Sequence, residues 1–268
     1  MKIGQSKVYF VKNLSNMHYP FYILLGLLPS LVWLSFYLRK DKHPEPNSMV
    51  LKIFIYGMLL APLAIVLELL LIWLLEPTID FSSLLSRTGQ GSLFKIILAA
   101  TLIPALVEEY LKYSVVKYKV LKSSVFDEPV DAMLYCIIAG LGFAAVENLL
   151  IIFKNTSFPD ALTVISLRFL GATLVHALAS GMIGYWLALG LLYTKQRKKL
   201  ILTGLTLAII FHSCYNYLTI TFFNRVIFEQ KIIFLSLIVF LLIFVAFLVS
   251  YYFRKLKRQQ AICKISTQ

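Results

Sequence analysis

The chain has 268 residues, of which 59% are hydrophobic and only 15% are charged, and its formal net charge is +13. Soluble domains are nearer half apolar and about a quarter charged, so this composition excludes an ordinary soluble domain. Because the apolar residues form blocks of about 20, the length at which a helix crosses the hydrocarbon core, the sequence predicts an all-α, polytopic membrane helix bundle.

Hydropathy predicts about seven transmembrane helices in a single domain. The fifth is too long for a straight crossing, so we expect it to tilt, to bend at Gly171 or to extend past the membrane. A polar N-terminal tail (1–20) precedes the transmembrane domain (21–253), and a basic C-terminal tail (254–268) follows it. The predicted helices cover residues 21–38, 50–75, 93–116, 130–153, 162–192, 200–223 and 232–253.

Basic residues are distributed unevenly between the two ends of these helices. The loops after the first, third and fifth helices and the C-terminal tail hold 15 Lys and Arg residues, against 8 on the opposite side. The positive-inside rule therefore predicts a cytoplasmic C-terminus. Attraction to anionic membrane lipids accounts for the same charge. No nucleic-acid-binding motif accompanies it, so we expect no nucleic-acid partner.

The third predicted helix carries Glu108, Glu109 and Lys112 in the string ALVEEYLKY. Ionisable groups inside a bilayer are costly unless they face a partner or a hydrated cavity. Lys112 lies one helical turn from each glutamate, where its ammonium favours an ionised carboxylate while burial opposes it. Such a carboxylate suits a general base for water. The alternative is that this is the cytoplasmic helix end, with Lys112 reaching the interface.

The fourth predicted helix begins with capping residues and carries an acid near its other end. Asp127 or Glu128 can cap it, Pro129 suits its first position, and Asp131 lies in the first turn. Further along, Glu147 lies beside small residues that allow a neighbouring helix to approach closely. Glu147 is therefore a second candidate acid, although a lone buried glutamate can also be protonated and purely structural.

His176 and His212 lie on adjacent predicted helices. Small and polar residues recur every four positions from Arg168 through His176 to Gly184, which predicts a helix-contact face. Asn216 follows His212 by one turn. A single helical histidine is often structural, but two on neighbouring helices, each with a polar partner, also suit a catalytic site.

Two expectations concern the placement of the acids. Glu68 has no polar neighbour in the second helix, and a pair with Arg168 would account for it. At 1.5 Å per residue, Glu108 lies about 22 Å below the outer end of its helix and Glu147 about 9 Å below the outer end of its own. Unless the helices tilt, these two acids are too far apart to share one water.

Together these strings resemble the PrsW family of intramembrane proteases, which is related to the CAAX prenyl endopeptidases. The resemblance runs in order over roughly residues 20–225, and the matching strings are YLRKDKHPEP, the Glu-Glu-x-x-Lys motif, FDEPVDAMLY, GLGFAAVEN and the two histidine motifs. It implies an enzyme of the bacterial plasma membrane that hydrolyses a peptide bond in a single-span membrane protein, as in site-1 cleavage of an anti-sigma factor. It leaves the oligomeric state open.

The predicted catalytic residues are Glu108, Glu109, Lys112, Glu147, His176, His212 and Asn216. In a cofactor-free scheme, Glu108 or Glu109 activates water and Glu147 is a second acid, while the histidines and Asn216 hold the water or stabilise the oxyanion. The alternative is a zinc site, in which Glu147, His176 and His212 bind Zn²⁺ and Glu108 or Glu109 is the base. The sequence does not decide between them, and the lack of a His-Glu-x-x-His motif slightly favours the cofactor-free scheme.

A proton- or ion-coupled transporter is the rival function, because buried acids and histidines also form proton relays. Transporters of that kind often contain inverted repeats and helices broken near the midplane. Neither feature is evident in this sequence, which favours the protease.

Overall fold

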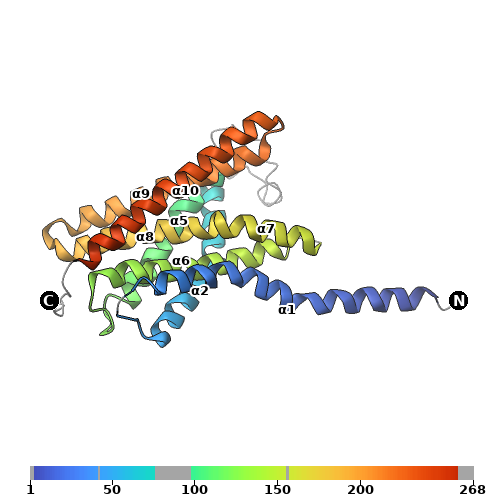
Figure 1. Ribbon diagram of the computed structural model, residues 1–268, viewed down its shortest axis with the longest axis horizontal. Coiled ribbons are helices and arrows are strands. Elements are labelled where there is room, and N and C mark those ends of the chain that lie inside the picture. The colour runs from blue at the N-terminus through green and yellow to red at the C-terminus, as the bar shows by residue number, and fades with distance from the viewer. Residues whose placement is uncertain (1–2, 42, 76–97, 155–156, 259–268) are drawn as a thin grey trace.

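The computed structural model describes residues 3–41, 43–75, 98–154 and 157–258, with side chains from Tyr19 onward, and the secondary structure of these residues is entirely helical (Figure 1). This confirms the all-α class. The elements are α1 (Ile3–Leu38), α2 (Asn47–Leu75), the π-helical turn η1 (Leu98–Leu102), α5 (Ile103–Lys119), α6 (Pro129–Ile152), α7 (Phe158–Leu170), α8 (Ala172–Leu192), the 3₁₀ turn η2 (Thr194–Gln196), α9 (Arg197–Asn224) and α10 (Phe228–Lys257).

Six helical segments of the described chain are long and apolar enough to cross a membrane, close to the predicted seven. The predicted helix 93–116 begins outside the described residues, and its described part is η1 and α5. Helix α5 has only 17 residues and carries both glutamates and three lysines, which makes it the least apolar of the predicted spans. The predicted fifth helix is divided into α7 and α8 at Gly171, as expected.

Helix α6 lies at the centre of the bundle, where it packs against α8, α2 and α1. It begins at Pro129 with Glu128 as its N-cap, one of the two predicted candidates, and Glu128 and Asp131 form a capping box. Glycines let α8 approach α6 closely, because a methyl group at Gly140 would collide with Ser180 and one at Gly184 with Met133. The close contact fixes the face of α8 that carries His176 against α6.

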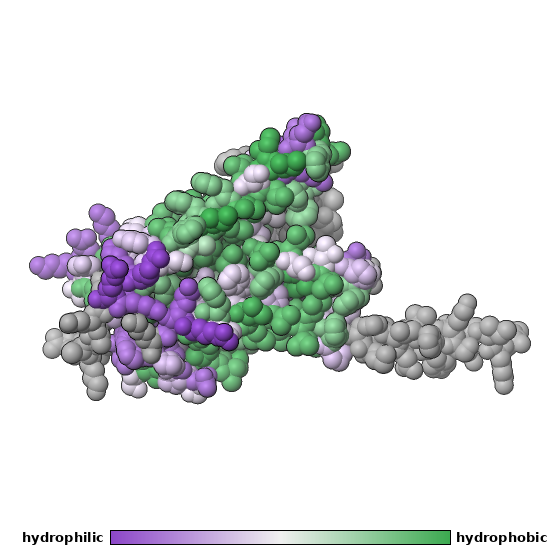
Figure 2. All heavy atoms as spheres, in the orientation of Figure 1, coloured by the Kyte–Doolittle hydropathy of each residue, from purple (hydrophilic) through white to green (hydrophobic). Residues whose placement is uncertain are grey.

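The surface of the bundle divides into an apolar flank and a polar end. Figure 2 shows hydrophobic side chains over the flank and hydrophilic ones gathered at the end where α8 joins α9. The exposed basic residues of that connection are Lys195, Arg197, Lys198 and Lys199. Helix α10 adds a row of exposed apolar side chains, among them Phe240, Phe244 and Phe247. This is the surface of a membrane protein, and the cytoplasmic location of the basic end stays a prediction.

Candidate active site

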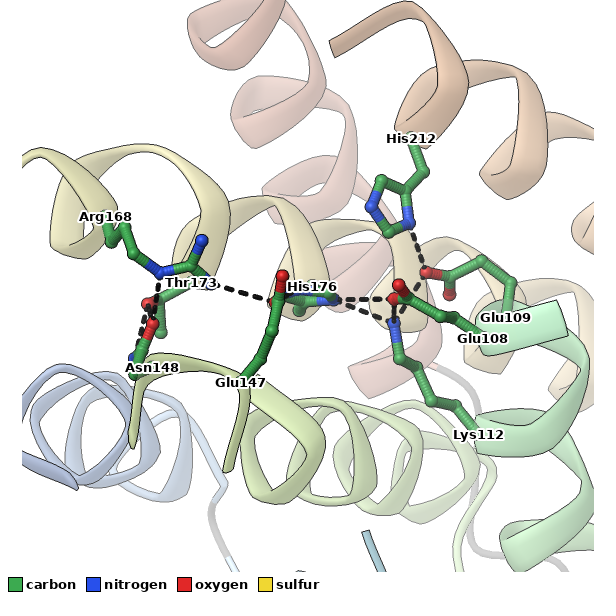
Figure 3. Close-up of polar contacts among 9 residues, drawn as sticks. All are labelled: Glu108, Glu109, Lys112, Glu147, Asn148, Arg168, Thr173, His176 and His212. Carbon is green, nitrogen blue, oxygen red and sulfur yellow. Dashed lines mark hydrogen bonds and ion pairs between the residues drawn. The ribbon is translucent and has the colours of Figure 1, made fainter. Parts of the chain in front are cut away.

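Polar side chains from four helices meet inside the bundle (Figure 3). Helix α6 provides one carboxylate, α8 and α9 each provide an imidazole, and α5 provides two carboxylates and an ammonium. All but the α6 carboxylate are buried. The structure thus brings together six of the predicted residues, namely Glu108, Glu109, Lys112, Glu147, His176 and His212.

Lys112 lies between three acceptors. Its Nζ atom is 2.8 Å from Oε1 of Glu109, 3.1 Å from Oε2 of Glu108 and 2.8 Å from Nδ1 of His176. An ammonium group has three N–H donors and no acceptor, so each donor is matched to one acceptor. The charge also lies 4.5 Å from the centre of the Phe143 ring, which adds a cation–π contact. Lys112 is therefore a fully bonded internal cation and does not reach the membrane interface.

Both ring nitrogens of His176 are engaged, and this determines its tautomer. Because Lys112 can only donate, Nδ1 of His176 must accept its hydrogen bond and carries no proton. The proton of the neutral ring is then on Nε2, which lies 2.7 Å from Oε2 of Glu147 and donates to it. His176 Nδ1 is also 3.6 Å from Oε2 of Glu108. His176 thus joins Glu108 to Glu147, and the depth difference expected for straight helices does not separate the two acids.

Glu109 has one saturated and one unsatisfied oxygen. Its Oε1 accepts from Lys112 and lies 2.9 Å from Nδ1 of His212, which donates to it. Its Oε2 is buried and has no hydrogen-bond partner among the described residues. A buried carboxylate oxygen is rarely left unbonded, so this atom indicates room for a further polar group or ion. The rings of His176 and His212 lie edge to face beside it, 5.1 Å apart.

Two polar residues considered in the sequence analysis, Asn216 and Glu68, form no hydrogen bond with the central group of described residues. Asn216 lies one turn beyond His212, half-buried, and forms no hydrogen bond with another described residue of the site. The expected pair between Glu68 and Arg168 is wrong, because Arg168 binds Glu147 instead. Glu68 nevertheless lies within electrostatic range of Glu108 and Glu147.

Arg168 contacts the site but is not among the catalytic residues predicted from the sequence. Its Nη2 atom is 2.8 Å from Oε2 of Glu147, and its Nε atom is 2.6 Å from Oδ1 of Asn148. The four-residue stripe that contains Arg168 and His176 was the available signal, since it places both residues on the face of the α7–α8 segment that packs on α6.

A second polar cluster lies at the start of α6, apart from this site. Asp41, Glu45 and Asp131 bring carboxylate oxygens within 4.8 Å of one another, and the hydroxyl of Tyr135 donates to Glu45. Burial raises the pKa of Glu45 above its ordinary value, and the nearby negative charges of Asp41 and Asp127 add to the rise. This cluster ties the loop after α1 to α6.

The central group offers the donors of a metal site. One donor atom from each of Glu108, Glu109, His176 and His212 lies within 4.8 Å of the others, and all four residues are buried. This set contains both histidines of the predicted zinc ligands but has Glu108 and Glu109 in place of Glu147. Imidazole and carboxylate donors suit zinc, and the unbonded Oε2 of Glu109 supports the fit.

Comparison with known proteins points to a metalloprotease, in agreement with the candidate metal-binding group. Residues 45–249 match the model of the PrsW family, described as intramembrane metalloproteases. The chain is 29% identical to a Protease PrsW of Geobacillus kaustophilus, over 73% of this chain and 78% of that protein. It is 27% identical to Protease PrsW of Bacillus subtilis, over 73% of this chain and 81% of that protein. No solved structure matches it. The resemblance predicted from the sequence is confirmed, and the chain belongs to the PrsW family of intramembrane metalloproteases.

Proposed function

We propose that this intramembrane protease cleaves a single-span membrane protein, such as an anti-sigma factor, with a water molecule activated by Glu108. One observation carries the proposal: Glu108, Glu109, His176 and His212 come from three helices and converge within 4.8 Å in the interior of a membrane bundle. Burying so many ionisable groups is costly and gives a scaffold nothing, whereas peptide hydrolysis needs a base, a proton donor and an electrophile together.

Glu108 is the stronger candidate for the base. Its side chain is 10% exposed, whereas that of Glu109 is 0% exposed. Oε1 of Glu109 is already shared by Lys112 and His212. Glu108 is therefore the carboxylate of the pair that water can reach. Glu109 holds the ammonium of Lys112 and the imidazole of His212 in place. After Glu108 takes the proton of the water, the same carboxyl can deliver it to the leaving amine.

Lys112 and His176 orient this base. Lys112 donates to Glu108 and so fixes the carboxylate in one position. His176 lies next to the same oxygen, and its Nε2–H is directed at Glu147 on the far side. A developing oxyanion near Lys112 would gain from its positive charge, and one well-placed donor contributes roughly 3 kcal/mol to such a step.

Glu109, His176 and His212 would hold a zinc ion, for which Nδ1 of His176 would give up its hydrogen bond from Lys112. The ion would supply a Lewis acid for the scissile carbonyl. Bound zinc should be measured by mass spectrometry of the purified protein. About one equivalent is expected, and it should fall in Glu109→Gln and His212→Ala variants. Zinc-free protein that retains full activity would remove the metal from the proposal.

The enzyme assay uses proteoliposomes that contain the purified chain and, one at a time, the single-span membrane proteins of the source organism with a tag at each end. Wild type should release a tagged fragment that Glu108→Gln and His176→Ala do not release. Glu229→Gln, which changes an exposed acid at the start of α10, is the matched control and should cleave normally. Equal cleavage by Glu108→Gln and wild type would refute the mechanism. Proton flux that needs Glu108, without any cleavage, would instead identify a transporter.

The membrane and its orientation belong to the same proposal. We expect the protein in the cell membrane, with the basic end of the bundle, including Lys195 and Lys198, at the cytoplasmic face beside anionic lipids. Labelling of single cysteines introduced at the two ends of α9 in intact cells measures this. Modification by a membrane-impermeant reagent at the Arg197 end would contradict it.

A further inference from the structure

The site has an arginine whose contacts suit a role in positioning. Arg168 is in the last turn of α7, and its guanidinium contacts two consecutive residues of α6. Its side chain is 14% exposed, while that of Glu147 is 32% exposed. The carboxylate is thus the more exposed member of the pair, and the ion pair with Arg168 holds it against α7.

Asn148 anchors the guanidinium independently of Glu147. Oδ1 of Asn148 accepts from Nε of Arg168 at 2.6 Å, and Nδ2 of Asn148 donates to Oγ1 of Thr173 at 3.1 Å. Asn148 and Thr173 are both 0% exposed. The Nε atom of the arginine is therefore fixed by a buried amide, so Nη2, beside it on the same edge of the guanidinium, is presented to Glu147 at a defined position (Figure 3).

The break between α7 and α8 brings Arg168 to this position. Gly171 separates the two helices, and a methyl group there would collide with the hydroxyl of Tyr215 on α9. Just before the break, in the last turn of α7, the carbonyl oxygen of Phe169 accepts a hydrogen bond from Nε1 of Trp33 on α1 at 2.8 Å. Contacts from α1 and α9 thus hold the last turn of α7 against α6.

A single oxygen joins the arginine to the histidine. Oε2 of Glu147 accepts from Nη2 of Arg168 at 2.8 Å and from Nε2 of His176 at 2.7 Å. In metalloenzymes, a carboxylate that accepts a hydrogen bond from the N–H of an imidazole fixes the orientation of the ring. It also makes the other ring nitrogen more basic, and so a better metal ligand or hydrogen-bond acceptor. Here that other nitrogen is Nδ1, which faces Lys112 and Glu108.

We infer that Arg168 is a positioning residue, which holds the carboxylate of Glu147 against Nε2–H of His176 and thereby orients this imidazole toward the catalytic centre. This role rests on the proposed function, because the orientation of His176 affects catalysis only if Glu108 is the base. Arg168 itself contacts none of Glu108, Glu109, Lys112 and His212 in the described structure, and so acts through Glu147 and His176.

The first test needs neither substrate nor metal loading. The Nε2–H proton of His176 can be observed by NMR of ¹⁵N-histidine-labelled protein in nanodiscs, because the chain has only 4 histidines and a His176→Ala spectrum assigns the signal. A hydrogen bond to carboxylate moves this proton downfield and slows its exchange with water. We expect both features in wild type and in Arg168→Lys, which keeps the charge. Both Arg168→Met and Glu147→Ala should lose them.

The matched control is Ser166→Ala, which removes an exposed hydroxyl of α7 that donates to the carbonyl oxygen of Leu162 and leaves the contacts of Arg168 with Glu147 and Asn148 in place. It should leave the His176 signal unchanged. If Arg168→Met only lowers the thermal stability, with the His176 proton as in wild type, the arginine is structural and the inference is wrong.

A double-mutant cycle of Arg168→Met and Glu147→Ala provides an independent test. It measures the cleavage rate of whichever tagged protein the wild type cleaves. Loss of a residue that orients a ligand or base through one intermediate typically costs about 10- to 100-fold, so Arg168→Met should lower kcat by that factor with little change in KM. Added to Glu147→Ala, the same substitution should cost almost nothing. A full additional loss in the Glu147→Ala background would overturn the inference. Failure of the proposed function would appear separately, as Glu108→Gln cleaving like wild type.

Discussion

Replacement of Lys112 by methionine removes the internal cation and keeps much of the side-chain volume. In the wild type, Nζ lies 2.8 Å from Glu109 and 3.1 Å from Glu108. Without it, two carboxylates whose oxygens lie within 4.8 Å face one another in a buried space. At an effective dielectric constant near 20, their repulsion is about 3.5 kcal/mol. This agrees with the loss of about 3–5 kcal/mol that follows removal of one partner from a buried ion pair.

Thermal unfolding in detergent micelles measures the effect. A loss of about 3.5 kcal/mol corresponds to a fall in Tm of about 7–14 °C for a chain of this size. Lys117→Met, on the same helix but exposed, is the control and should leave Tm unchanged. Adding Glu109→Gln to Lys112→Met removes one of the two charges and should recover at least half of the lost stability. A Lys112→Met protein with the wild-type Tm, or a double variant less stable than the single one, would refute the electrostatic reasoning.

Two further predictions concern packing and pH. Gly142→Ala should lower Tm, because its methyl group would meet the backbone carbonyl of Phe54 on α2, whereas at Gly190 the nearest atom to an added methyl is 3.3 Å away and the same substitution should lower Tm much less. Because burial raises the pKa of Glu45, the folded state holds its proton more tightly than the unfolded state, so stability should fall as pH rises from the ordinary carboxyl range toward neutrality. Glu45→Gln should flatten this pH dependence in thermal melts, and an unchanged slope would contradict the assignment.

Much of the local structure could be predicted from the sequence because its causes are local. The start of α6 follows from capping residues within five positions of Pro129, and the division of the long fifth segment follows from Gly171. The close α6–α8 contact follows from glycines at positions such as Gly140, since only small residues let two backbones approach. These features needed no knowledge of how distant helices are arranged.

The relations between helices could not be predicted in the same way. Sequence spacing gives the face of a helix that carries a residue, but not its rotation toward each neighbour or its tilt. For this reason Arg168 was expected to pair with Glu68 and instead pairs with Glu147. The assumption of straight, parallel helices likewise put Glu108 and Glu147 too far apart, although His176 contacts both.

The position of Lys112 has a consequence for how the protein is made. A newly inserted chain must keep Glu108 and Glu109 within the bilayer before the other helices have packed around them, and the lysine close by on the same helix offsets one of the two negative charges. Helix α5 can therefore enter the membrane with its acids already paired and then assemble with α6, α8 and α9. Insertion of this helix thus does not depend on a partner charge from another helix.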